Sequence, residues 1–119
     1  MSSTTTEIWH YNRCSKSRQT LQLLEEKGLE PKVRNYREEG PTKEELQDVL
    51  AKLELTAREL ARTKDSAFSA HREETSAFEG DDQWVDFLVA HPEFIERPVV
   101  IHGEKAALGR PPEKVLEIL

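Results

Sequence analysis

Cysteine is nearly absent from this sequence of 119 residues, which holds Cys14 and no second thiol. A lone cysteine excludes an internal disulfide, and with it the disulfide-stapled class of small secreted domains. The sequence also lacks any apolar run near the roughly 20 residues that a membrane-spanning helix needs. Its start, MSSTTTE, has neither the charged nor the apolar region of a signal peptide. We therefore predict a cytoplasmic protein with no membrane partner. The small polar residues 1–6 predict a flexible start.

The sequence is low in hydrophobic residues and has fewer basic than acidic residues. Hydrophobic residues make up 36% of the chain, and 17 Lys and Arg stand against 23 Asp and Glu, which gives a net charge of −6. This length and composition favour a single domain over residues 1–119 with one modest core. The acidic balance argues against nucleic acid as a partner, so an anionic ligand would need a local positive pocket. We predict no metal site.

The chemistry that is present centres on Cys14. Residues 8–11 have the pattern of a short strand, residues 12 and 13 that of a turn, and Ser15 that of the start of a helix. Cys14 would then lie at a helix N-terminus, where unpaired N–H groups and the helix dipole favour an anion. We predict a reactive thiol with a pKa below the ~8.5 of a free cysteine. Further positive charge nearby comes from Arg13, Lys16 and Arg18, and from His10 if it is protonated.

Competing interpretations exist for these residues. Cys14 could be an inert buried thiol, the usual state of a free cysteine. Its neighbours Arg13, Ser15 and Lys16 argue against this, because buried cysteines usually have apolar neighbours. His10 could be a packed strand residue with a satisfied hydrogen bond, and the basic residues beside Cys14 could serve only to tune the local field.

Hydrophobic periodicity predicts the next elements. The first helix should end at Lys27-Gly28, where glycine suits a left-handed C-cap. Residues 32–36 alternate like a second strand, which completes a βαβ unit. Thr42 and Glu45 form a capping-box signature ahead of a helix with apolar residues at positions 46, 49, 50 and 53. A short helix over residues 57–63, a mixed segment and a helix closed by His91-Pro92 follow, so residues 42–92 form a helical insertion.

Residues 99–101 and 105–108 return to the pattern of strands and predict a β-hairpin with a tight turn at His102-Gly103. Two prolines then suit the first turn of a closing helix, in which Val115, Leu116 and Leu119 are the apolar residues. Arg97 and Arg110 each precede a proline, which favours extended backbone at the edges of the hairpin strands. The complete order is βα, β, helices, ββα.

Four segments together carry a resemblance to a known family: RCSKSR at 13–18, RELAR at 58–62, HPEFIERPVV at 91–100 and GRPPEKVLEIL at 109–119. Through them the chain resembles the arsenate reductases of the glutathione- and glutaredoxin-coupled type, in a shorter branch that ends at the last helix. The resemblance implies an α/β, thioredoxin-like fold. Its four-stranded mixed sheet would combine the βαβ unit with the C-terminal ββα, with the helical insertion between the second and third strands.

The resemblance also implies roles for individual residues. Cys14 corresponds to the catalytic cysteine, and the three anion-binding arginines correspond to Arg62, Arg97 and Arg110. Arg62 is alternatively a solvated helix residue. His10 corresponds to a histidine thought to promote thiolate formation, and Pro98 to the cis-proline that faces the cysteine in thioredoxin folds. The family's loop reads HNP where this chain has His10 followed by Tyr11 and Asn12, so the proline that stiffens the loop is missing.

The activity implied by the resemblance is reduction of arsenate or a similar oxyanion, with glutathione as co-substrate, glutaredoxin as partner and no bound cofactor. Arginine suits such a ligand because its planar fork can hold two oxygens and keeps its proton. Ser17 stands where dithiol enzymes of this fold have their second cysteine, so the resolving thiol must come from outside. Two alternatives stay open: a monothiol oxidoreductase that acts on glutathione mixed disulfides, and a binding protein like the Spx-type transcription regulators.

Overall fold

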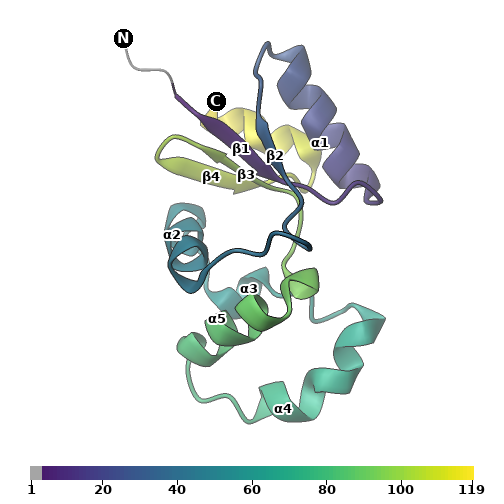
Figure 1. The fold of residues 1–119 in the computed structure, drawn as a ribbon, viewed down its shortest axis with the longest axis vertical. Helices are drawn as coiled ribbons and strands as arrows, with labels where there is room; N and C mark the ends of the chain where they lie inside the picture. The colour runs from purple at the N-terminus through teal and green to yellow at the C-terminus, as the bar shows by residue number, and fades with distance from the viewer. Residues whose placement is uncertain (1–3) are drawn as a thin grey trace. The chain divides into compact units, whose positions relative to one another are not determined.

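The computed structural model of the protein describes residues 4–119. Its sheet has the strand order β2-β1-β3-β4 (Figure 1). The strands are β1 (Thr6–Trp9), β2 (Lys32–Arg34), β3 (Val99–His102) and β4 (Lys105–Leu108). β1 pairs parallel with β2 and antiparallel with β3, and β3 pairs antiparallel with β4. The predicted α/β fold with a four-stranded mixed sheet is confirmed.

The chain divides into two compact units. The sheet unit comprises the chain up to Glu39 together with Arg97–Leu119, and the helical unit comprises Gly40–Glu96. The predicted helical insertion, residues 42–92, falls inside the helical unit. Residues 1–3 of the predicted flexible start lie outside the described residues, and Thr6 already belongs to β1. Among the described residues, no helix is both long and apolar enough to cross a membrane.

In the sheet unit, α1 (Ser15–Glu26) and the 3₁₀ helix η3 (Pro112–Ile118) pack together on one face of the sheet. The core that they enclose contains the fully buried side chains of Ile8, Leu24, Val100 and Val115. Removal of this apolar surface from water is the main force that holds α1 against β1 and β3. α1 ends as its sequence predicts, with Gly28 in the left-handed region at φ 81°.

The closing helix differs from its prediction, because it is a 3₁₀ helix rather than an α-helix. With three residues per turn, positions 112, 115 and 118 share one face, and these residues are buried or half-buried. Leu116 and Leu119 lie off that face and are 37% and 42% exposed. The predicted grouping of Val115 with these two leucines is therefore wrong, since it assumed the α-helical period.

Three other element boundaries also differ from the predictions. The first strand covers Thr6–Trp9 rather than residues 8–11, and the second ends at Arg34. The short helix α3 (Ala57–Leu60) ends before Arg62, so Arg62 is not a helix residue. Instead, Ala61 forms an isolated β-bridge with Ile95, and Arg62 N–H donates to the Phe94 carbonyl at 2.7 Å.

The helical unit contains α2 (Lys43–Leu53), α3, η1 (Ser66–His71), α4 (Arg72–Ser76), α5 (Asp81–Ala90) and η2 (Pro92–Phe94). The predicted capping box of Thr42 and Glu45 is present, and a second one joins Thr56 to Glu59 at the start of α3. Aromatic rings gather between η1, α5 and η2, where Phe68 stacks on Trp84 at a centroid distance of 6.2 Å. The same Phe68 ring meets Phe94 edge-on at 5.5 Å.

Candidate functional site

Cys14 occupies the junction between the loop after β1 and the start of α1. It is the N-cap of α1, in extended backbone at φ −94° and ψ 123°. The Cys14 N–H donates to the Tyr11 carbonyl at 3.0 Å, and the Cys14 carbonyl accepts from the Arg18 N–H at 3.0 Å. The residue is only partly buried. The predicted position at a helix N-terminus is therefore confirmed, with the thiol held in place and within reach of solvent.

The loop before Cys14 is fixed by hydrogen bonds. Ser17 is fully buried, and its hydroxyl accepts from the Tyr11 N–H at 3.0 Å and shares a hydrogen bond with His10 Nδ1 at 2.7 Å. The Arg18 guanidinium donates to the Asn12 carbonyl at 2.8 Å. These contacts tie the loop to the first turns of α1 and so restrict its movement.

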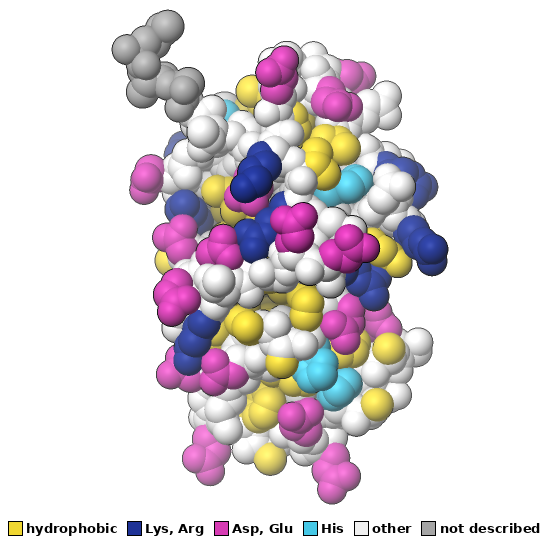
Figure 2. Space-filling model, in the orientation of Figure 1, with side chains coloured by type: hydrophobic (Ala, Val, Ile, Leu, Met, Phe, Trp, Pro, Cys, Tyr) yellow, Lys and Arg dark blue, Asp and Glu magenta, His cyan; other side chains and the backbone are white. Residues whose placement is uncertain are grey.

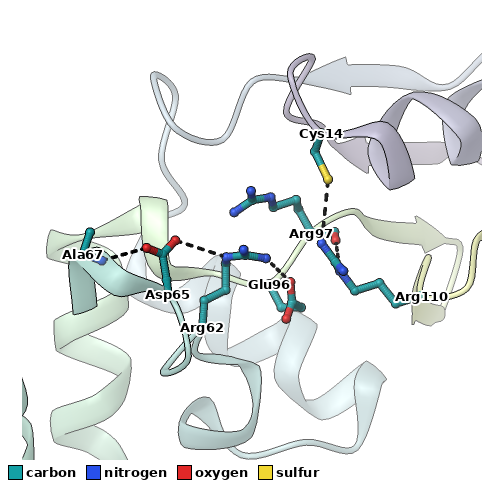
Figure 3. A network of polar contacts seen from close by, with 7 residues as sticks. All are labelled: Cys14, Arg62, Asp65, Ala67, Glu96, Arg97 and Arg110. Atoms are coloured by element: carbon teal, nitrogen blue, oxygen red, sulfur yellow. Dashed lines mark hydrogen bonds and ion pairs between the residues drawn. The ribbon is translucent and has the colours of Figure 1, made fainter. Parts of the chain in front are cut away.

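Arg97 and Arg110 lie beside the thiol in the sheet unit (Figure 3). Arg110 Nη2 is 3.7 Å from Cys14 Sγ. Arg110 Nε donates to the Arg97 carbonyl at 2.7 Å, which orients the guanidinium toward the sulfur. The Arg97-Pro98 peptide bond is cis, as is Arg110-Pro111. The structure thus brings Cys14 together with Arg97 and Arg110, two of the three predicted arginines.

The pKa of Cys14 is lowered from the ordinary value of a thiol. Burial is the largest influence and raises this pKa, but it is outweighed by the N–H of Ser17, the Arg97 side chain and the N–H of Lys16. The prediction of an acidified thiol agrees with this direction. The lowered pKa comes mainly from the first turn of the helix and from Arg97, rather than from the exposed Arg13.

His10 behaves as a packed residue. The residue is 7% exposed, and burial lowers its pKa below 6.5. A hydrogen bond that the ring donates to the Asn12 side chain acts in the opposite direction, and the charge of Arg18 adds to the lowering of the pKa. A neutral imidazole at pH 7 supplies little positive charge to the thiol. The interpretation of His10 as a packed ring with a satisfied hydrogen bond therefore fits the structure better than that of a cationic activator.

Arg62 belongs to the helical unit, where two carboxylates pair with it (Figure 3). Its Nη1 is 2.6 Å from Glu96 Oε1, and its Nε is 3.7 Å from Asp65 Oδ2. The backbone bridge between Ala61 and Ile95 places Arg62 and Glu96 side by side. The alternative of a freely solvated helix residue does not hold, because Arg62 is an ordered and charge-paired side chain.

Sequence reasoning missed the contacts of Tyr11, whose carbonyl accepts from the Cys14 N–H, and of Arg37, which lies on the Tyr11 ring. Arg37 Cζ lies over the Tyr11 ring at 4.3 Å from its centroid, and Arg97 Cζ lies over the same ring at 5.0 Å. Tyr11 was noticeable only as a departure from the family's loop, and Arg37 carried no signal at all. Ser15 is exposed in the first turn of α1. Within residues 4–119, no group of three or more His, Cys, Asp or Glu is placed to hold a metal ion.

Residues 9–118 match the ArsC family. The chain belongs to this family. An arsenate reductase from Haemophilus influenzae is 41% identical over 113 residues, which cover 94% of this chain and 97% of the relative. An arsenate reductase from Escherichia coli strain K12 is 36% identical over 112 residues, which cover 94% of this chain and 79% of the relative.

Solved structures of the ArsC family agree with this assignment. An arsenate reductase from Vibrio cholerae superimposes with a TM-score of 0.91 at 39% sequence identity, and covers 99% of this chain and 100% of the other. The resemblance to the arsenate reductases and the thioredoxin-like fold that it implied are therefore confirmed. Cys14 and the three arginines all lie inside the region that matches the ArsC family.

Proposed function

We propose that the protein reduces arsenate to arsenite, with Cys14 as nucleophile, Arg97 and Arg110 as the anion-holding side chains, and glutathione and glutaredoxin as the source of electrons. The observation that carries this proposal is the contact of Cys14 Sγ with Arg110 at 3.7 Å, in a site that lowers the pKa of the thiol. A thiolate and an arsenate anion repel each other, so a site that unites them needs fixed cations around both.

In the proposed reaction, the Cys14 thiolate bonds to arsenic and an oxygen leaves as water. The sulfur of glutathione then displaces a second oxygen, also as water. One of the two arsenic–sulfur bonding pairs becomes the new sulfur–sulfur bond and the other stays on arsenic as a lone pair, so As(V) is reduced to As(III). One water adds to the released As(III) to give arsenite. The sum converts one arsenate and two thiols into one arsenite, one disulfide and water. Because Cys14 is the chain's sole thiol, glutaredoxin then reduces the mixed disulfide and returns Cys14 to its thiol form.

Arg62 is proposed as the third anion-binding residue through the resemblance. Its charge is engaged by Glu96 and Asp65 in this structure, so binding of an oxyanion would require exchange of one of these carboxylates. This engagement favours the second candidate function, thiol exchange on glutathione mixed disulfides without arsenate activity. That reaction needs Cys14 and its acidified thiol, but does not need three arginines.

The test is arsenate-dependent NADPH consumption with glutathione, glutaredoxin and glutathione reductase. Cys14→Ser should abolish turnover. Arg97→Ala should lower kcat/KM by roughly 10- to 100-fold, since a hydrogen bond to a charged group is worth about 1.5–3 kcal/mol. Arg13→Ala is the matched control, because Arg13 is exposed, and should lower kcat/KM by less than about 3-fold, the scale of a surface charge interaction.

Either of two outcomes would overturn the arsenate proposal. One is no arsenate-dependent turnover by protein whose Cys14 is shown to be reduced. The other is equal loss of activity in Arg97→Ala and Arg13→Ala. If the same protein reduces a glutathione mixed disulfide without arsenate, the second candidate function takes its place.

A further inference from the structure

Two guanidinium groups share the ring of Tyr11, and one of them belongs to the thiol site. Arg97 Cζ lies 5.0 Å from the ring centroid, and the Arg97 side chain is among the groups that lower the pKa of Cys14. Arg37 Cζ lies 4.3 Å from the same centroid. A tyrosine face attracts a guanidinium electrostatically and by stacking, and the contact leaves the N–H edges of the guanidinium available to other partners.

Tyr11 is itself well anchored, which lets it hold an arginine in place. Its N–H donates to the buried Ser17 hydroxyl, and its carbonyl accepts from the Cys14 N–H. The backbone that carries the ring is therefore tied to the same turn of α1 that carries the thiol. Movement of Arg97 away from Cys14 would also break its contact with this ring.

Arg37 is exposed and follows the buried Tyr36 at the turn after β2. Among residues 4–119, no carboxylate pairs with Arg37, although Glu38 and Glu39 are its neighbours in sequence and are exposed. Because no carboxylate pairs with it, the exposed Arg37 guanidinium can donate its N–H groups to an anionic group that reaches this surface from solution. Acidic and basic side chains are both spread over the face shown in Figure 2.

We propose that Tyr11 is a positioning residue that holds Arg97 at the Cys14 thiolate, and that Arg37 on the same ring forms a subsite for the carboxylate of an acidic thiol co-substrate. This inference rests on the proposed function, because it specifies the class of thiol that completes the reaction at Cys14.

The positioning role is tested by the pH dependence of Cys14 alkylation with iodoacetamide, a neutral reagent that needs neither arsenate nor glutathione. Tyr11→Leu should raise the apparent pKa of the thiol and lower the rate at pH 7 by about 2- to 5-fold, the worth of an exposed cation–π contact. Tyr11→Phe keeps the ring and should match the wild type. Circular dichroism at the same pH checks that each variant is folded. An unchanged pH profile in folded Tyr11→Leu would overturn the positioning role, as would equal shifts in Tyr11→Leu and Tyr11→Phe.

The subsite is tested by thiol exchange at Cys14. The protein is prepared as the mixed disulfide of Cys14 with 2-mercaptoethanol. A thiolate then attacks the 2-mercaptoethanol sulfur, a new disulfide forms, and the bond to Cys14 breaks with its electron pair on Cys14. Loss of the adduct is followed by mass spectrometry with 3-mercaptopropionate, which carries a carboxylate, and with 3-mercaptopropionamide, its neutral isostere. Glutathione is the third thiol in the series.

Arg37→Gln should lower the ratio of the 3-mercaptopropionate rate to the 3-mercaptopropionamide rate by about 2- to 5-fold relative to the wild type, as expected for one partly exposed ion pair. Arg37→Lys should keep most of the ratio, and added salt should reduce the ratio in the wild type. The control is Lys32→Gln, an exposed cation at the other end of β2. An unchanged ratio in Arg37→Gln, or the same change in Lys32→Gln, would overturn the subsite. Because no arsenate is present, absence of arsenate turnover would leave this result standing and would refute only the proposed function.

Discussion

Replacement of Ser17 by alanine tests whether hydrogen bonds, rather than a proline, fix the loop that carries Cys14. The hydroxyl of Ser17 is fully buried and serves both the Tyr11 N–H at 3.0 Å and His10 Nδ1 at 2.7 Å. Alanine leaves both groups without this partner. Each buried polar group left unsatisfied costs about 1–3 kcal/mol, with the partly buried Tyr11 N–H at the low end, so we expect the free energy of unfolding to fall by about 2–4 kcal/mol.

Urea denaturation followed by far-ultraviolet circular dichroism measures this loss. With an m-value of about 2 kcal/mol/M, typical of a chain this small, the midpoint should fall by about 1–2 M. Ser15→Ala is the matched control, because Ser15 lies in the same turn of α1 but is exposed, and surface substitutions usually change stability by less than about 0.5 kcal/mol. A midpoint for Ser17→Ala that coincides with that of Ser15→Ala would refute the view that Ser17 holds the loop.

Two further predictions concern the neighbours of the loop. Burial lowers the pKa of folded His10 below 6.5, so the unfolded chain takes up the proton first as the pH drops. The free energy of unfolding of the wild type should therefore fall as the pH drops from about 6.5 towards the folded pKa. In urea titrations between pH 8 and 5, His10→Gln should lack this part of the pH dependence, and the same pH dependence of stability in variant and wild type would contradict the prediction. In Gly109→Ala, the new Cβ would clash with Thr20 Oγ1 and would lie 2.7 Å from Pro98 Cγ. The free energy of unfolding obtained from its melting curve should therefore be lower by about 1–3 kcal/mol, as for other overpacked sites. The control Gly80→Ala, whose Cβ meets nothing within 4 Å, should lose less; equal losses would count against the packing argument.

Local signals made several elements predictable. α2 was predictable because two signals lie within one short segment of the sequence: the capping box of Thr42 and Glu45, and the apolar spacing that follows it. The position of Cys14 at the start of α1 was predictable for the same reason. The closing helix was not, because its residues repeat at a spacing that fits both three and 3.6 residues per turn, and packing against α1 and β4 decided between them.

The candidate site was predictable only where the family resemblance supplied long-range information. It linked Cys14 with Arg97 and Arg110, and the structure places these residues together. The pairing of Arg62 with Glu96 depends on a β-bridge between segments 34 residues apart, a contact that no local pattern encodes. The Tyr11 ring and its two guanidiniums were missed for the same reason.

The antiparallel pairing of β3 with β1 has a consequence for the order in which the thiol acquires its properties during synthesis. Cys14 leaves the ribosome early, whereas Arg97 and Arg110, which follow the helical unit in the chain, are made only after more than 80 further residues. Until β3 docks beside β1, the nascent thiol lacks both guanidiniums and is closer to an ordinary cysteine in acidity. Reactivity toward oxidants and oxyanions would therefore appear only in chains whose sheet is already complete, which protects the growing polypeptide from premature modification.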